Sequence, residues 1–210
     1  MNSHRIEGAQ LTNTFSEMFL NESSQIIGEI DTNSIERVAK GLSLVRDRGG
    51  RLFILGVGGS AGHASHAVND FRKLCGFEAY APTDNVSELT ARANDEGWDS
   101  TFEAWLQGSR IGERDAIFVF SVGGGSLERN VSVNLVRAID LAVVTKASIY
   151  GIVGRDGGYT KSYADECIVI PPLFHDHVTP HTEGLCAVIW HLLVSHPLLS
   201  RATAKWESMR

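Results

Sequence analysis

Cysteine is scarce in this chain, and long apolar runs are missing. Its 210 residues include three cysteines, whose odd number and wide spacing fit neither a disulfide framework nor a zinc knuckle: Cys75, Cys167 and Cys186. We therefore expect reduced thiols in a cytoplasmic protein. No run of about 18 apolar residues occurs, so we expect no membrane span. The first residues also lack the apolar stretch of a signal peptide.

The chain also lacks an excess of positive charge. It carries 19 Lys and Arg against 25 Asp and Glu, a formal net charge of -6. This balance argues against nonspecific nucleic-acid binding, because such binding needs a basic face. The hydrophobic fraction of 43% and the charged fraction of 21% are ordinary for a globular protein. Without an internal repeat or a linker, residues 1–210 are predicted to form one domain.

Strand and helix patterns alternate along the chain and predict an α/β fold, a three-layer sandwich with a five-stranded parallel sheet between helices. The expected strands cover about 51–56, 78–81, 115–120, 148–153 and 166–170. The expected helices cover about 10–30, 33–48, 60–74, 86–93, 98–107, 126–146, 159–164 and 180–195. The N-terminal segment 1–48 has no strand, so we expect it to pack on the sheet or on another subunit.

Two Gly/Ser-rich turns follow predicted strands. The first is Gly56-Val57-Gly58-Gly59-Ser60, and the second covers 121–126, before an apolar pattern that predicts a long helix. Glycine allows a tight turn and close approach of a ligand, and the N–H groups that open a helix favour an anion. One such turn alone can be a plain connection. Two at the carboxyl ends of strands predict a phosphate or sugar-phosphate site.

Histidines and carboxylates form two groups in the sequence. His66 and Asp70 are four residues apart on the helix after the first turn, so they share a face, and His63 is close enough to join them. Such a pair suits proton transfer or a zinc-like ion, but it is also common on solvated helices. Glu183 and His191 lie on the predicted last helix. His191 stands in an apolar stretch and is equally compatible with a core position.

Three more histidines precede that helix: His175, His177 and His181. We interpret them as loop residues, with a supporting role beside a site as the alternative.

These motifs occur in the order found in the sugar isomerase (SIS) domain family, which the chain resembles over nearly its whole length. The resemblance is closest to the phosphoheptose isomerases and implies a flavodoxin-like sheet. The matching segments are 56–60, His66 with Asp70, Asn94 and Asp95 before Gly97 and Trp98, 121–126, 154–158, and Glu183 with His191.

The chain departs from the family pattern at several positions. Val57 replaces an asparagine, and Val122 and Gly123 replace two hydroxyl residues. Asp70 stands for a glutamate and Glu183 for a glutamine. Two carboxylates close together repel each other unless a cation lies between them. Asp70 and Glu183, together with His66 and His191, therefore need a metal ion more than the family's usual residues do. The substitutions are compatible with the reaction class, but they change groups that contact the sugar.

The resemblance implies an aldose–ketose isomerase that converts sedoheptulose 7-phosphate into D-glycero-D-manno-heptose 7-phosphate through an enediol. Asp70 is then the base and His191 the acid. A divalent ion, zinc above all, is implied at His66, Asp70, Glu183 and His191. Substrate contacts are implied for Gly58, Gly59, Ser60, Asn94, Asp95, Ser121, Gly123, Ser126 and Glu183.

The resemblance also implies a homotetramer with its sites at subunit interfaces. Glu183 and His191 lie about 12 Å apart along one straight helix, because each residue rises 1.5 Å. Both can hold one ion only if the first turn bends or if two chains contribute.

Two other functions stay open at this point. One is an isomerase of a different sugar phosphate. The other is a non-enzymatic SIS module, an adaptor or sugar-phosphate sensor, in which the loops are kept and the acid and base are lost.

Overall fold

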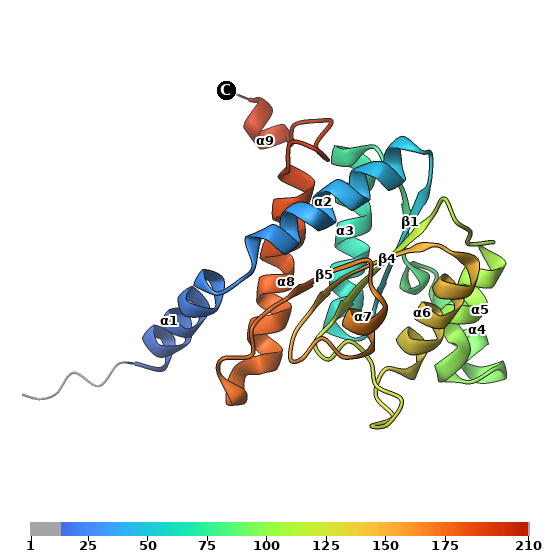
Figure 1. Cartoon of the computed structure of the whole chain (residues 1–210), viewed down its shortest axis with the longest axis horizontal. Helices are drawn as coiled ribbons and strands as arrows, with labels where there is room; N and C mark the ends of the chain where they lie inside the picture. The colour runs from blue at the N-terminus through green and yellow to red at the C-terminus, as the bar shows by residue number, and fades with distance from the viewer. Residues whose placement is uncertain (1–13, 210) are drawn as a thin grey trace, which may run out of the picture.

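A five-stranded parallel sheet forms the centre of the protein (Figure 1). The computed structural model describes residues 14–209. The strands are β1 (Arg51–Gly56), β2 (Glu78–Tyr80), β3 (Ala116–Ser121), β4 (Ser148–Val153) and β5 (Glu166–Val169). Their order is β2-β1-β3-β4-β5, the flavodoxin-like order. The predicted parallel α/β fold is therefore confirmed.

Helices cover both faces of the sheet. One face carries α2 (Thr32–Asp47), α3 (Gly59–Cys75) and α8 (Val178–Ser195), and the other carries α4 (Val86–Asp95), α5 (Thr101–Gly108) and α6 (Val133–Thr145). Short elements complete the chain: α7 (Gly158–Tyr163), α9 (Lys205–Ser208), and the 3₁₀ turns η1 (Pro82–Asp84), η2 (Trp98–Ser100) and η3 (His175–His177). In Figure 1, α1 (Phe15–Gly28) projects from the body beside the start of α8.

The central strands are apolar except at their end residues, because both of their faces are covered. In β1, Leu52 and Ile54 join the core under α2, α3 and α8, whereas Phe53 and Leu55 join the core under α5 and α6. This alternation follows from the period of two along a strand. Because each face of the sheet has its own core, residues that point to either face are apolar, and the strands are continuous apolar runs in the sequence.

The starts of the helices expected at 126–146 and 180–195 differ from the sequence-based expectation. The helix expected at 126–146 begins only at Val133, because Ser126 and Val131 pair as an antiparallel bridge and Ser132 has a positive φ of 50°. The last helix begins at Val178 and includes Pro180, which is tolerated there because the first-turn N–H groups have no helical partner. The first helix is described from Phe15, and its predicted start near residue 10 lies outside the described residues.

Within residues 14–209, no helix is long and apolar enough to cross a membrane. The three cysteines are free thiols, two of them buried.

A buried carboxylate ties the amino ends of two central strands together. Asp115 precedes β3 and accepts hydrogen bonds from the Arg51 backbone N–H (2.9 Å) and guanidinium (2.7 Å), and from the Gly112 N–H (3.0 Å). Burial alone raises the pKa of Asp115, but the hydrogen bonds from Arg51 and Gly112 outweigh burial and leave the pKa below its usual value.

We predict that Asp115→Asn lowers the free energy of unfolding by about 1.5–3 kcal/mol at neutral pH, the scale of hydrogen bonds to a charged group. Because the folded-state pKa is lowered, this stabilisation is complete above the unfolded-state pKa of about 4 and is lost as the pH falls through the folded-state value. Denaturant unfolding at several pH values measures the difference, which should shrink in acid. Exposed Glu113, changed to Gln, is the control, and an Asn variant as stable as the parent would contradict the assignment.

Candidate active site

The first Gly-rich turn joins β1 to α3 and needs glycine at two places. A Cβ on Gly56 would collide with the backbone of Ser60, and Gly58, which precedes the helix, has a φ of 63°. Ser60 is buried in the first turn of α3. The opening N–H groups of α3 therefore lie at the carboxyl end of β1, beside the point where the strand order reverses between β1 and β3. This is the predicted anion-binding position.

The first turn of α8 lies against the same edge of the sheet. A Cβ on Gly59 would lie 2.7 Å from Oε1 of Glu183, so this carboxylate sits against the start of α3. A Cβ on Gly154, which follows β4, would collide with the Thr182 hydroxyl. Glycine at 59 and at 154 thus makes room for α8, and Glu183 lies beside the first loop.

The second loop is held by hydrogen bonds from its own backbone and from the loop after β4. The Ser121 hydroxyl accepts from the Gly124 N–H (3.0 Å), and the Gly124 carbonyl accepts from the Thr160 N–H (2.9 Å) and hydroxyl (2.8 Å). A Cβ on Gly124 would collide with the carbonyl of Gly157. The two backbones therefore approach so closely that side chains are excluded.

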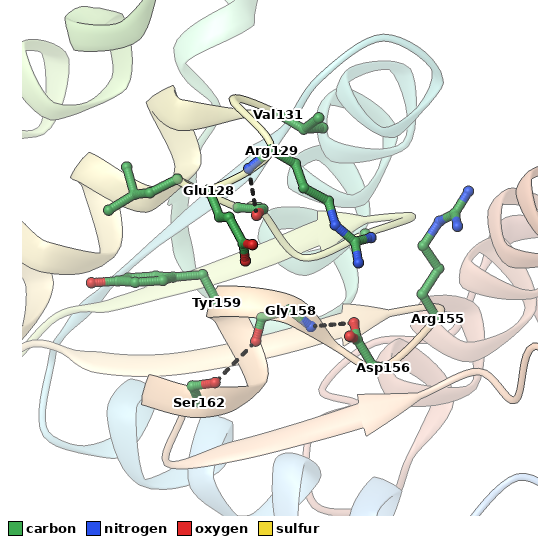
Figure 2. Close-up of a pocket in the computed structure, with 12 residues that line it drawn as sticks. Glu128, Arg129, Val131, Arg155, Asp156, Gly158, Tyr159 and Ser162 are labelled. Carbon is green, nitrogen blue, oxygen red and sulfur yellow. Dashed lines mark hydrogen bonds between the residues drawn. The ribbon is translucent and has the colours of Figure 1, made fainter.

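The second loop does not open a helix directly, which corrects the expectation for residues 121–126. Ser126 lies seven positions before Val133, and its hydroxyl accepts from the Arg129 N–H (3.2 Å). Beside it opens a pocket of about 690 Å³ (Figure 2). Figure 2 shows Arg129 and Arg155 extending toward the same side of this pocket, whose wall also includes Gly123. The carboxylates of Glu128 and Asp156 line the same pocket, so two guanidinium groups and two carboxylates surround it.

His66, Asp70 and His191 converge where α3 packs against α8. Nε2 of His66 lies 3.7 Å from Oδ2 of Asp70, and Nε2 of His191 lies 3.9 Å from the same oxygen. The two imidazole rings meet edge to face at 5.3 Å. Their side chains are 57% and 50% exposed, so the alternative of a core position for His191 is wrong.

The orientation of His191 is set by its neighbours. Nδ1 lies 2.7 Å from the Ala187 carbonyl, which can only accept, so Nδ1 carries a hydrogen and Nε2 is the nitrogen that faces Asp70. The ring stacks on Trp190 at 3.5 Å. A backbone carbonyl behind a ring nitrogen is the usual support of a metal-binding histidine. The group borders a pocket of about 430 Å³ whose other wall includes Ala204 and Glu207.

The three side chains fit the donor set of a zinc-like ion. Their ligand atoms lie within 4.8 Å of one another. The separations of 3.7 and 3.9 Å exceed a hydrogen bond but suit two ligands that share one ion at about 2.0–2.2 Å each. Two imidazoles and one carboxylate are ligands that zinc accepts, with a fourth position open.

Glu183 is not part of this group within one chain. It lies beside Gly59, near the start of α3, whereas His66 and Asp70 lie two to three turns further along that helix. The straight α8 keeps Glu183 and His191 apart, as the spacing of eight residues indicates.

Asn94 and Asp95 are also remote from the group within one chain. They end α4, on the sheet face opposite α3 and α8, and the Asn94 amide donates to the Asp95 carboxylate (2.7 Å). A single chain does not bring them to His66.

A second cluster was not predicted. Glu22 of α1 meets His177 and His181. His181 was expected in a loop but is buried in the first turn of α8. The four-residue spacing of His177 and His181 could have predicted that these two imidazoles lie side by side. The sequence around Glu22 could not have predicted its contact with histidines more than 150 positions away.

Known proteins similar to this chain include phosphoheptose isomerases and a protein of lincomycin biosynthesis. The chain is 34% identical over 168 residues to the phosphoheptose isomerase of Sulfurimonas denitrificans, covering 77% of this chain and 80% of that protein. It is 31% identical over 189 residues to the lincomycin biosynthesis protein LmbN of Streptomyces lincolnensis, covering 85% of this chain and 65% of that protein. The chain thus spans less than two thirds of the Streptomyces protein.

Solved structures share the fold. The phosphoheptose isomerase of Neisseria gonorrhoeae superposes with a TM-score of 0.74 at 22% identity, over 85% of this chain and 94% of that one. The enzyme of Francisella tularensis gives a TM-score of 0.71 at 21% identity, over 88% and 97%. No family model matches the chain. On the identity and coverage of its relatives, the chain belongs to the phosphoheptose isomerase family of SIS-domain proteins.

Proposed function

We propose that this protein isomerises a phosphorylated ketose to the corresponding aldose, with sedoheptulose 7-phosphate as the substrate. One observation carries the proposal: the group of His66, Asp70 and His191 lies along the helix that opens at the predicted anion site. Ser60 and His66 are separated by about 9 Å along α3, since six residues rise 1.5 Å each. That span is comparable with the distance from the phosphate of an extended sugar phosphate to its reacting carbons.

The chemistry requires a base and an acid at neighbouring atoms of the sugar. Asp70 takes the proton from the carbon beside the carbonyl, while His191 gives a proton to the carbonyl oxygen, and an enediol results. Return of the first proton to the adjacent carbon, and loss of the other hydroxyl proton to His191, give the isomer. Because Ala187 holds a hydrogen on Nδ1, His191 acts as an acid only when Nε2 is protonated too.

His66, Asp70 and His191 would hold a zinc-like ion, which when bound supplies positive charge beside oxygens that become negative. Binding of the ion and transfer of protons use the same atoms of Asp70 and His191. The two roles therefore compete.

Asp70→Asn and His191→Ala should each lower kcat by at least about 10², the scale of general acid–base catalysis. Exposed Asp47, changed to Asn, and exposed His175, changed to Ala, are matched controls outside the group. Steady-state assays with sedoheptulose 7-phosphate measure the effect. If the Asp70→Asn variant is folded by circular dichroism and turns over at the parental rate, Asp70 is not the base.

We assign the phosphate to the two loops, with contacts from Ser60, Ser121 and Ser126 and from the N–H groups of Gly58, Gly59 and Gly123. Arg129 and Arg155 offer guanidinium donors in the pocket beside Ser126, which Glu128 and Asp156 also line. The mutual approach of the two loops at the carboxyl ends of β1 and β3 supports this assignment.

Ser126→Ala should raise KM roughly tenfold and change kcat less, because phosphate binding is nearly equal in the ground and transition states. Ser162 lines the same pocket, but its hydroxyl donates to the Gly158 carbonyl, so Ser162→Ala is the control. Unchanged KM values in both the Ser121 and the Ser126 alanine variants would contradict the assignment.

We further propose a homotetramer in the cytoplasm, with each site completed at a subunit interface. Support comes from the half-exposed imidazoles of His66 and His191, and from the distance of Glu183, Asn94 and Asp95 from them within one chain. A second copy of the chain would have to bring its Glu183, Asn94 and Asp95 to the His66 and His191 of the first copy.

Light scattering should give the mass of four chains, and dilution below the dissociation constant should abolish turnover. A fully active monomer would contradict the interface site.

A different sugar phosphate is the second candidate substrate. The substitutions Val57, Val122 and Gly123 remove polar groups from the loops, and one relative is named for lincomycin biosynthesis and not for heptose metabolism. Measuring turnover of phosphorylated ketoses with five, six, seven and eight carbons shows whether sedoheptulose 7-phosphate or another sugar phosphate is the substrate. Binding of these compounds without any turnover would favour a sugar-phosphate sensor, and no binding at all would favour an adaptor.

A further inference from the structure

A second group of metal-binding side chains lies outside the site described above. Glu22 is on α1, His177 ends the short η3 turn, and His181 is in the first turn of α8. Nδ1 of His177 and Nε2 of His181 both lie 2.8 Å from the same oxygen, Oε2 of Glu22. The ligand atoms of all three residues lie within 4.8 Å of one another.

These side chains are held in a largely dry environment. His181 is 3% exposed, Glu22 10% and His177 22%, so the group is reached from solvent mainly past His177. Phe19 stacks on His181 at 4.2 Å and meets the edge of His177 at 5.5 Å. Phe15 contacts the other side of His177 at 5.7 Å. The phenyl rings of α1 thus fix both imidazoles in place.

The second nitrogen of His181 has a supporting partner. Nδ1 lies 3.2 Å from the Ser23 hydroxyl, and that hydroxyl lies 3.1 Å from the Phe19 carbonyl. When Ser23 gives its hydrogen to Phe19, its oxygen accepts from Nδ1–H, and the neutral ring then has no hydrogen on Nε2, which faces the Glu22 carboxylate. In that arrangement either a second proton on the ring or a bound cation lies between Nε2 and the carboxylate. Metal-binding histidines are commonly supported in this way through their second nitrogen.

We propose that Glu22, His177 and His181 form a second binding site for a divalent cation of the zinc class, which fastens α1 to the start of α8. Two imidazoles and one carboxylate match the ligands of zinc and leave a fourth position for water. The four-residue spacing of His177 and His181 places both on one face. The ligand atoms must move from 2.8 Å to about 3.4 Å apart to surround an ion. Figure 1 shows α1 beside the start of α8, the two helices that the ion would join.

The site differs in role from the group at His66. It joins two helices and borders neither Gly/Ser-rich loop, so an ion there orders α1 and has no part in proton transfer. The simpler arrangement, in which the imidazoles hydrogen-bond to the carboxylate without an ion, makes the opposite prediction about metal binding.

Calorimetric titration of the chelator-treated full chain with Zn²⁺ distinguishes these arrangements. The background variant His66→Ala/His191→Ala removes the first group, and it should still bind one Zn²⁺ per chain and gain thermal stability from it. Adding Glu22→Gln should abolish both effects. Adding Ser23→Ala, which keeps all three ligands, should weaken binding about tenfold, as expected for the loss of a supporting partner. Exposed His175, changed to Ala, is the control.

The proposal is overturned if the background variant binds no Zn²⁺, or if Glu22→Gln leaves binding unchanged in that background. Circular dichroism and the melting temperature without metal show whether each variant is folded. A Zn²⁺-binding background variant whose parent shows no isomerase activity would refute the proposed function but leave this second site standing.

Discussion

The packing of α3 against α8 is the contact on which the candidate site depends. The two helices run in the same direction on one face of the sheet, since Gly59 meets Glu183 near their starts and Asp70 meets His191 further along. Both helices follow strands of a parallel sheet, so both begin at the carboxyl edge. The contact between the two helices therefore has the predicted anion-binding turn at its start and the cluster of two imidazoles and a carboxylate further along.

Close approach at that edge is made by residues that lack side chains. Gly56, Gly59 and Gly154 leave room for a turn, for Glu183 and for Thr182, respectively. At the opposite edge, Asp115 and Arg51 join the starts of β1 and β3 by buried hydrogen bonds. A buried, hydrogen-bonded carboxylate thus joins the strands at their amino edge, and glycines allow close approach of loops and helices at their carboxyl edge.

Much of this could be predicted from the sequence. Continuous apolar runs predicted the strands because both faces of the sheet are covered, and the spacing of His66 and Asp70 predicted one shared helix face. The spacing also showed that Glu183 and His191 cannot meet on one straight helix, which the structure bears out.

Other features depend on contacts that no local pattern reveals. Leu127 and Val131 resemble the start of a helix, but both are exposed in a loop that the bridge to Ser126 and the positive φ of Asn130 hold in place. The last helix was expected from about residue 180 but begins at Val178, since a first helical turn accepts Pro180. Glu22 meets His181 only because α1 crosses the start of α8, a tertiary contact across 159 positions.

The central claim is that Asp70 of α3 and His191 of α8 perform proton transfer on a sugar phosphate. The direct measurement is nuclear magnetic resonance of sedoheptulose 7-phosphate incubated with the purified protein in D₂O. The account predicts an aldose heptose 7-phosphate that carries deuterium at the carbon beside its carbonyl, because the proton held by Asp70 exchanges with solvent. Unchanged sedoheptulose 7-phosphate with no deuterium on carbon, together with the same result for every other ketose phosphate of five to eight carbons, would contradict it.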